Sequence, residues 1–420
     1  MRCEHIRSSL SGRLPLDTPS RTLGMRSMSP AQRAGLAAIV IACLPALSPG
    51  DEPPAAKKPH DAPPAAAEWL VTRQGLAFAY EMGGTSAYQK RVTAFDEAGG
   101  QTQSGKDVSF IANRSGGLVP RGLARYDSHF ALLTKGGSFR ATGGINYLLD
   151  ACKTSGAFTV EALLTSGQIT LDHPGVILQL GPTSGRPNLA LQQDGNKILL
   201  RLRTAVDGKA AENKTELLVW PDDKTHHLAV TYGASVLTVY LDGKQVLRSE
   251  SVTGDFSRWR ASELVFGDAY SGDANWPGKL EGIAFYRRAL QATELQQQSA
   301  ACSQRFAART DPPRVRLIGK LKACTPTPTP EKIAPYYQAL GVYEYAVESV
   351  KEGKYSEPVV RVAHWVILDK QQLPVATRPL GTTVEMTLEP YAANPQLETD
   401  FWVVDTLEIS DLPLMYEVGP

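Results

Sequence analysis

KTHHLAVTYGASVLTVYLDGK, residues 224–244, is the stretch of this sequence that decides the fold. It contains two short, mostly apolar runs with β-branched and aromatic residues, His227–Tyr232 and Val236–Leu241, each as long as one β-strand. Directly after the second run comes Asp242-Gly243, with apolar residues on both sides. A two-residue type I′ turn needs a positive φ at both central positions, so this Asp-Gly pair predicts a β-hairpin.

The same pattern recurs along much of the chain. Asp194-Gly195-Asn196 predicts a second hairpin, and Ala292–Gln298 is the one short segment with a helical pattern. The 36 Gly and 29 Pro show no collagen-like period and suit many turns. Many short strands joined by tight turns predict an all-β antiparallel sandwich or jelly roll. The further predicted strands are Phe158–Leu164, Gly175–Leu180, Asn188–Gln192 and Lys197–Arg203.

Five segments in order resemble the successive strands of laminin G-like, concanavalin A-like jelly-roll domains. Gly75–Glu81 and Gly116–Arg140 look, more weakly, like the first strands of the same domain. The resemblance implies a sandwich of two curved antiparallel sheets over residues 69–310, and a role in binding sugars or proteins outside the cell. The five segments are FTVEA from Phe158, KTHHLAVTY from Lys224, LTVYLDGK from Leu237, LVFGD from Leu264 and WPGKLEGIAFYRRAL from Trp276.

Residues 311–420 form a second predicted domain, whose start is marked by Asp311-Pro-Pro and by the TPTPTP run from Thr325. Five alternating segments predict a small all-β domain, a five-stranded barrel of the oligomer-binding type. That type often binds single-stranded nucleic acid, but this part of the chain has 10 Lys and Arg against 15 Asp and Glu. An acidic surface opposes phosphate binding, and the whole chain has a net charge of only +1, so we expect no nucleic acid partner. The five segments are Arg314–Leu321, Leu340–Val350, Pro358–Leu368, Thr382–Leu388 and Phe401–Ile409.

The N-terminus has the pattern of an export signal. Ala34–Leu47 is apolar, follows basic residues and is too short to span a bilayer, which predicts a signal peptide within residues 1–50. Val40–Cys43 resembles a bacterial lipobox, which would make Cys43 a lipidated N-terminus; ordinary cleavage after Gly50 is the alternative. Residues 51–68, rich in Pro and Ala, predict an extended linker. We expect an exported protein, periplasmic, on the cell surface or extracellular.

Catalytic motifs are missing from the sequence. Hydrolases of the concanavalin A-like fold have two or three carboxylates at alternating positions of one strand, and no such run occurs here. Glu161 and Glu281 are isolated within their strands, and no nucleophile elbow, phosphate-binding loop or zinc-protease helix is found. We therefore expect no enzymatic activity.

The loop Gly267–Gly278 is the candidate binding site. Tyr270 and Trp276 could offer flat apolar faces to a sugar ring. Asp268, Asp273 and Asn275 could supply oxygen ligands to calcium, which prefers six to eight of them. The alternative is a structural turn whose tryptophan packs into the edge of the sandwich.

Two further pairs of residues belong to the sandwich. Cys152 and Cys302 could form a disulfide that joins the ends of the domain, or they could be separate buried thiols. His226 and His227 are adjacent on a predicted strand, so their side chains point to opposite faces and cannot bind one ion together. We expect one of the two histidines to be half-buried and hydrogen-bonded and the other to be exposed.

Together these features predict an exported, non-catalytic protein whose lectin-like sandwich binds carbohydrate, with calcium as a candidate cofactor. The first alternative is a scaffold or interaction protein that binds another protein of the cell envelope. The second alternative is a glycoside hydrolase-like enzyme.

Overall fold

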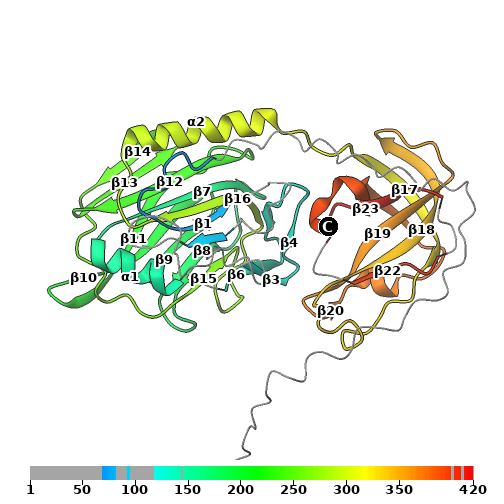
Figure 1. Ribbon diagram of the computed structural model, residues 1–420, viewed down its shortest axis with the longest axis horizontal. Helices are drawn as coiled ribbons and strands as arrows, with labels where there is room; N and C mark the ends of the chain where they lie inside the picture. The colour runs from blue at the N-terminus through cyan, green and yellow to red at the C-terminus, as the bar shows by residue number, and fades with distance from the viewer. Residues whose placement is uncertain are drawn as a thin grey trace, which may run out of the picture. The chain divides into compact units, whose positions relative to one another are not determined.

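The computed structural model describes residues 69–81, 92–94, 118–142, 145–398, 402–407 and 411–419. Their regular structure is mostly β-strand, in three sheets, as predicted (Figure 1). No helix in these ranges has the length and apolarity to cross a membrane. The predicted signal peptide, the linker 51–68 and the lipidation site Cys43 lie outside the described residues, so they stay predictions.

The first sheet of the sandwich has nine strands, and its main path runs β14-β13-β12-β7-β16-β1-β2. β5 pairs with β16 and with β4 beside this path. The pairings are antiparallel throughout. The strands are β1 (Leu76–Glu81), β2 (Val92–Ala94), β4 (Arg125–Tyr126), β5 (Leu132–Leu133), β7 (Phe158–Ser166), β12 (His226–Gly233), β13 (Val236–Leu241), β14 (Lys244–Ser249) and β16 (Gly278–Tyr286).

The second sheet of the sandwich has seven strands in the order β11-β10-β9-β8-β15-β6-β3. It is also antiparallel. Its strands are β3 (Leu118–Gly122), β6 (Gly137–Ala141), β8 (Gly175–Gly181), β9 (Leu189–Asp194), β10 (Lys197–Val206), β11 (Lys209–Val219) and β15 (Glu263–Phe266).

Both predicted hairpins are present. Asp242 and Gly243 have φ values of 51° and 75°, and Leu241 pairs with Lys244, so the turn has two central residues with positive φ. In the second hairpin Asp194 pairs with Lys197 around Gly195, which has a φ of 57°. The turn chemistry therefore sets the register of both hairpins.

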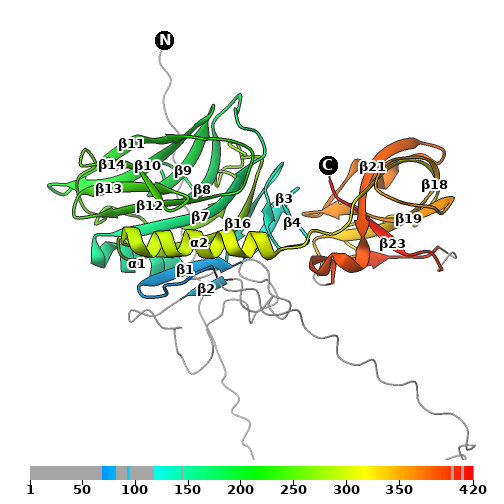
Figure 2. The ribbon, with the colours of Figure 1, turned by 90° about the horizontal axis from the view of Figure 1, so that it is seen from above.

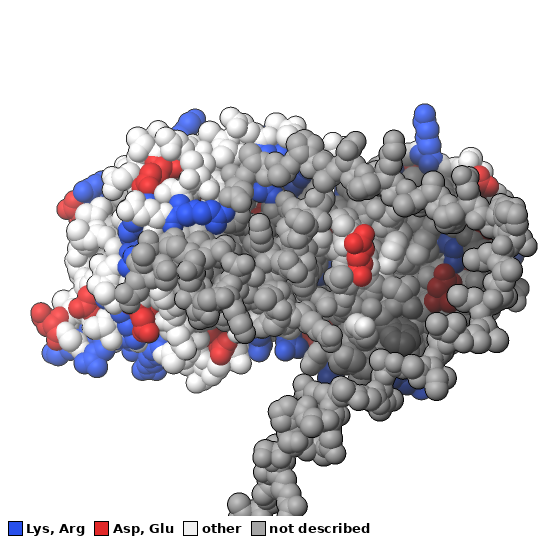
Figure 3. All heavy atoms as spheres, in the orientation of Figure 1, with Lys and Arg blue, Asp and Glu red and all other residues white. Residues whose placement is uncertain are grey.

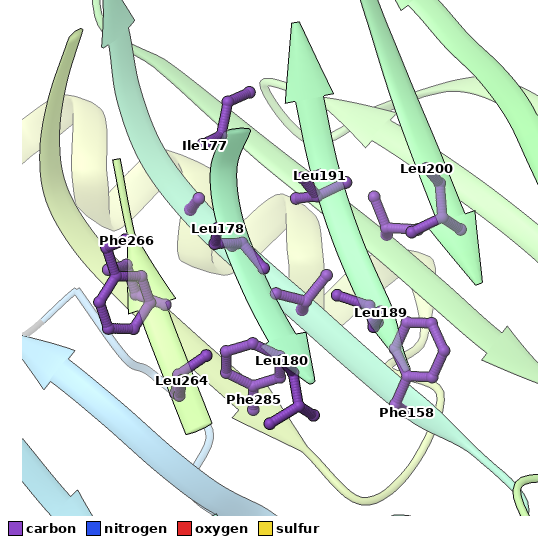
Figure 4. Close-up of a cluster of buried hydrophobic side chains, with 14 of the residues drawn as sticks. Phe158, Ile177, Leu178, Leu180, Leu189, Leu191, Leu200, Leu264, Phe266 and Phe285 are labelled. Atoms are coloured by element: carbon purple, nitrogen blue, oxygen red, sulfur yellow. The ribbon is translucent and has the colours of Figure 1, made fainter. Parts of the chain in front are cut away.

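The core lies between the two sheets and is built from alternate residues of the strands. Figure 4 shows Phe158 and Phe285 of the first sheet with Leu178, Leu189 and other side chains of the second. All of these side chains are at most 1% exposed. Burying one such side chain contributes roughly 1.5–3 kcal/mol relative to leaving it in water, so the alternation seen in the sequence is the main source of stability for the sandwich.

Two helices accompany the sandwich. α2 (Ala292–Ala308) is ten residues longer than predicted and lies along the outer face of the first sheet (Figures 1 and 2). Its Leu295 and Cys302 are buried there with Tyr240 and Tyr286 of the sheet. α1 (Ile145–Ser155) was not predicted, and its buried residues Ile145, Leu148, Leu149, Ala151 and Cys152 lie on one side at helical spacing.

The C-terminal domain is a closed five-stranded barrel in the order β19-β23-β21-β17-β18, with β18 also paired to β19. One element of the prediction is wrong: within Phe401–Ile409 the structure has the short strand β22, which pairs with β18 outside the ring. The fifth barrel strand is β23, which is parallel to β19. The elements are β17 (Val315–Cys324), β18 (Ala339–Glu352), β19 (Val359–Leu368), β20 (Gln371–Gln372), β21 (Thr383–Pro390), β22 (Trp402–Val404) and β23 (Leu414–Glu417), with 3-10 turns at Pro374–Thr377, Tyr391–Ala393 and Pro395–Leu397.

Candidate functional site

The outer face of the second sheet presents polar side chains from strands whose inner face is apolar. In β10, Leu200 and Leu202 are buried in the core, whereas Arg201 and Arg203 are only partly buried. Successive side chains of a strand point to opposite faces, so the two arginines project from the outer face.

Strand register places residues from distant parts of the sequence in one row across this face. Arg201 of β10 pairs with Ala190, which pairs with Gln179 of β8, and the row continues through Val265 to Arg140 of β6. Since Ala190 and Val265 are small, they leave space between the longer polar side chains.

Two residues of this row, Gln179 and Arg201, line a groove of about 270 Å³, which we call the Tyr270 groove. Gln179 and Gln192 line it with amides and Arg201 with a guanidinium group, while Tyr270 and Asp273 come from the loop Gly267–Gly278. Amides both donate and accept hydrogen bonds, and guanidinium donates several. A half-buried aromatic ring beside such groups suits a ligand with both hydroxyl groups and flat apolar faces, as a sugar has.

Tyr270 is held in place by Arg140 of β6. The Arg140 guanidinium lies 4.3 Å from the centre of the Tyr270 ring, a cation–π contact. Its Nη2 also donates a hydrogen bond of 3.2 Å to the Tyr270 carbonyl oxygen. The tyrosine is therefore attached to the sheet by both its ring and its backbone.

The rest of the loop is organised by structural hydrogen bonds. Asp268 Oδ1 accepts hydrogen bonds from the backbone N–H groups of Ala269 and Ala274, at 2.7 and 2.9 Å. Burial raises the pKa of the Asp268 carboxyl, although these two hydrogen bonds oppose the shift. Asn275 donates to the carbonyl oxygens of Thr134, Gly137 and Gly267 at 2.8–2.9 Å, so its amide ties the loop to the neighbouring turn.

The prediction that Trp276 offers a face to a sugar is corrected by its burial. Its side chain has 0% exposure and belongs to the core, and its Nε1 donates a 2.8 Å hydrogen bond to Gln193. Tyr270 is the one aromatic residue of the loop that lines the groove.

The three candidate calcium ligands do not point to one place. The side-chain oxygen of Asn275 accepts the N–H of Gly136 at 2.8 Å, away from Asp273, which accepts a hydrogen bond from Ser271. Within the described ranges no three His, Cys, Asp or Glu side chains form a cluster suited to a metal ion. Calcium binding stays a prediction, and it rests on Asp268 and Asp273 with backbone oxygens.

Of the two alternatives for Cys152 and Cys302, the structure has the separate buried thiols and not the disulfide, because both cysteines are free. Cys152 lies in the core between the sheets, whereas Cys302 lies under α2 on the other side of the first sheet. Burial raises the pKa of the Cys152 thiol to about 12 and also raises that of Cys302.

The isolated carboxylates of the strands have structural partners. Glu161 is fully buried on the outer face of the first sheet, where its carboxylate contacts His227 Nε2 at 2.7 Å and Gln298 Nε2 at 2.5 Å. Glu281, also fully buried, is ion-paired with Lys279 and Arg309 at 2.5 Å each. Neither carboxylate faces the Tyr270 groove, whose described lining has Asp273 as its one acidic residue.

The two adjacent histidines point to opposite sides, as predicted. His226 is half-buried and contacts Asp242 at 2.7 Å and Asp222 at 2.9 Å. Its partial burial opposes the charged form, but the hydrogen bonds to both aspartates raise the pKa of His226. His227 is buried beside Glu161. The expectation that the second histidine is exposed is therefore wrong.

Charge is mixed over the visible surface. On the face drawn in Figure 3, basic and acidic side chains of the described residues are interspersed among uncharged ones. The described side chains visible on that face form no continuous basic area of the kind that tracks a nucleic acid backbone.

Comparison with known families bears on the sandwich. Residues 141–296 match a laminin G family model described as the concanavalin A-like lectin/glucanases superfamily. The resemblance is confirmed for this segment. No curated protein matches the sequence.

Solved structures match parts of the chain at low similarity. A Trypanosoma rangeli sialidase in complex with the inhibitor DANA is 18% identical, with a TM-score of 0.32, over 42% of this chain and 28% of that one. The binding domain of botulinum neurotoxin DC, in complex with rat synaptotagmin II, is 9% identical with a TM-score of 0.40 over 75% of this chain and 78% of that one. Domain 4 of the arabinanase AbnA from Geobacillus stearothermophilus, in complex with arabinotriose, is 14% identical with a TM-score of 0.30. The match covers 43% of this chain and 82% of that one. The chain thus spans less than a third of the length of the sialidase.

The sheet residues of the groove were not among the residues predicted from sequence. Gln179, Gln192 and Arg201 each stand at a polar position within an alternating strand, which indicates an outward side chain. The Asp194-Gly195-Asn196 turn makes the strands of Gln192 and Arg201 neighbours, but no local signal indicates that the loop Gly267–Gly278 lies beside them.

Proposed function

We propose that this protein is a carbohydrate-binding protein and that the Tyr270 groove is its binding site. The observation that carries the proposal is that Gln179, Gln192 and Arg201 line one groove together with Tyr270, which Arg140 anchors to the sheet. Hydroxyl groups of a sugar can exchange hydrogen bonds with the amides and accept them from the guanidinium. The Tyr270 ring would cover an apolar face of the same sugar.

A glycan array probed with the full chain tests the proposal. We expect binding to a defined set of glycans, and we expect Tyr270→Ala to lower affinity for them at least about tenfold, because the ring's buried apolar area is lost. Gln192→Ala should lower it as well.

Matched controls come from the barrel. Tyr337 is 48% exposed and Gln372 is also exposed, so Tyr337→Ala and Gln372→Ala remove the same side chains elsewhere. These two variants should bind like the unmodified protein. If no glycan binds, the carbohydrate proposal is rejected and a protein partner of the cell envelope becomes the better hypothesis.

We further propose that the protein has no glycosidase activity. The support is that Glu161 and Glu281 are occupied by buried partners and that Asp273 stands alone in the described lining of the groove. One carboxylate cannot supply both the acid and the second carboxylate of glycoside hydrolysis. Release of reducing sugar from any glycan bound on the array, if abolished by Asp273→Asn, would overturn this part.

Calcium and export are two separate proposals. Millimolar calcium should raise the melting temperature if Asp268 and Asp273 hold the ion, and an unchanged melting temperature rejects calcium. Export is supported by the apolar run Ala34–Leu47, and mass spectrometry of the mature N-terminus distinguishes lipidation at Cys43 from cleavage after Gly50.

A further inference from the structure

A second cavity of about 180 Å³ adjoins the Tyr270 groove on the outer face of the second sheet. Pro187 lines both, and Arg203, which lines the second cavity, follows Arg201 by two residues on the same face of β10. Two residues along a strand span about 7 Å, so the two cavities are neighbours on this face. We call this second cavity the arginine subsite.

The arginine subsite has an excess of positive charge. Arg186, Arg203 and Arg260 line it with one carboxylate, that of Glu212. Glu212 is already occupied, because Oε2 is 2.8 Å from Arg186 and Oε1 accepts a 3.0 Å hydrogen bond from Arg201 Nε. The carboxylate inside the subsite is therefore not available to Arg203 or Arg260.

The Arg203 side chain has an unsatisfied donor. Its Nε is shielded from solvent and has no hydrogen-bond partner. Within the described part of the chain, neither Arg203 nor Arg260 forms a side-chain hydrogen bond or ion pair. An unpaired buried donor on a charged group costs free energy, which an acceptor supplied by a ligand would recover.

A single asparagine holds the two arginines in position. Asn188 has 0% exposure, and its backbone oxygen accepts the Arg203 N–H at 2.8 Å. Its side chain contacts the Arg260 backbone twice, accepting the N–H at 3.1 Å and donating to the carbonyl oxygen at 2.8 Å. The Trp259 indole also donates to the Arg203 carbonyl oxygen at 2.7 Å. The backbones of both arginines are thus fixed before any ligand binds.

We propose that the ligand of the Tyr270 groove is an acidic glycan, and that Arg203 and Arg260 bind its carboxylate or sulfate group in the arginine subsite. This inference rests on the proposed carbohydrate binding. Guanidinium is the group best suited to an anion with paired oxygens, because its donors form a planar fork. A neutral sugar would leave both charges without a counter-charge.

The test compares oligogalacturonate with the same oligosaccharide after its carboxyl groups have been reduced to alcohols, and heparin oligosaccharide with a form that is both desulfated and carboxyl-reduced. Binding to the full chain is measured by calorimetry at low and at physiological salt. We expect one acidic member to bind at least tenfold more tightly than its neutral counterpart, with the difference shrinking as salt rises.

Variants locate the effect. Arg203→Met and Arg260→Met should each lower affinity for the acidic probe about tenfold. Arg248→Met is the control, because Arg248 is exposed on β14 and pairs with Glu250; it should have no effect. Circular dichroism and melting confirm that each variant is folded.

The outcomes separate the two proposals. Equal affinity for a charged probe and its neutral form, or full affinity in both arginine variants, overturns the acidic-glycan inference. If Tyr270→Ala still abolishes binding in that case, the carbohydrate proposal stands. Absence of binding to acidic and neutral glycans alike rejects both.

Discussion

Gln298 of α2 provides the sharpest test of how the helix is held to the first sheet. Its side chain is fully buried, and Nε2 donates to both oxygens of the buried Glu161 carboxylate at 2.5 and 2.6 Å. Gln298 Oε1 accepts a hydrogen bond from the Tyr286 hydroxyl at 3.2 Å. Gln298→Leu keeps the size of the side chain and removes all of these bonds.

The expected loss of stability follows from the charge of the acceptor. A hydrogen bond to a charged group is worth about 1.5–3 kcal/mol, and a buried carboxylate that loses a partner also keeps its desolvation penalty. We expect Gln298→Leu to lower the free energy of unfolding by about 3–5 kcal/mol. For a domain of 150–250 residues this is a drop in melting temperature of roughly 6–20 °C.

Gln297→Leu is the matched control, since the neighbouring glutamine is exposed on the same helix. It should change stability by no more than about 0.5 kcal/mol. Both variants are compared by urea unfolding of the full chain, followed by tryptophan fluorescence. In the Gln298→Leu background, Glu161→Leu should cost less stability than in the unmodified protein, because the carboxylate has already lost Gln298 and keeps only His227 as a partner.

Two results would refute this reasoning. If Gln298→Leu and Gln297→Leu unfold at the same urea concentration, the buried hydrogen bonds contribute nothing net. If adding Glu161→Leu lowers stability by as much in the Gln298→Leu background as in the unmodified protein, the two side chains are not coupled.

Three further predictions concern the sandwich. Because the pKa of His226 is raised in the folded protein, its contribution to folding stability is complete below about pH 6.5 and is lost as pH rises through the pKa of the folded state. His226→Gln should therefore reduce the fall in melting temperature over that pH range. An unchanged slope of melting temperature against pH argues against the Asp242 contact. Cys152 and Cys302 should resist iodoacetamide in the folded protein and both react in denaturant without reductant; a cross-linked peptide would show the disulfide instead. Trp276→Phe should lower the free energy of unfolding by about 1–3 kcal/mol, because its hydrogen bond to Gln193 is lost, and should leave glycan affinity unchanged. Reduced glycan affinity with unchanged stability would indicate instead that Trp276 contacts the ligand.

Local signals account for much of the fold. The Asp242-Gly243 turn and the flanking alternation predicted a hairpin that the structure contains, because turn chemistry and strand period act over a few residues. α1 was missed because its eleven residues follow directly on strand-like segments and have no strong start signal. The fifth barrel strand was predicted at Phe401–Ile409 because that segment also has a strand-like pattern. In the structure the position in the barrel beside β19 is taken by β23, whereas β22 pairs with β18, and these long-range pairings are not visible in the sequence.

The sequence by itself determined that the chain folds as a β-sandwich followed by a barrel, since apolar alternation and Asp-Gly or Gly-rich turns are local properties. Only the tertiary structure decided the site. Arg140, Gln179 and Arg201 lie in one row because strands from distant parts of the chain pair side by side. Tertiary packing also decided which residues of the loop reach that row: Trp276 fills the core and Tyr270 lines the groove, because one side chain points between the sheets and the other lies against Arg140.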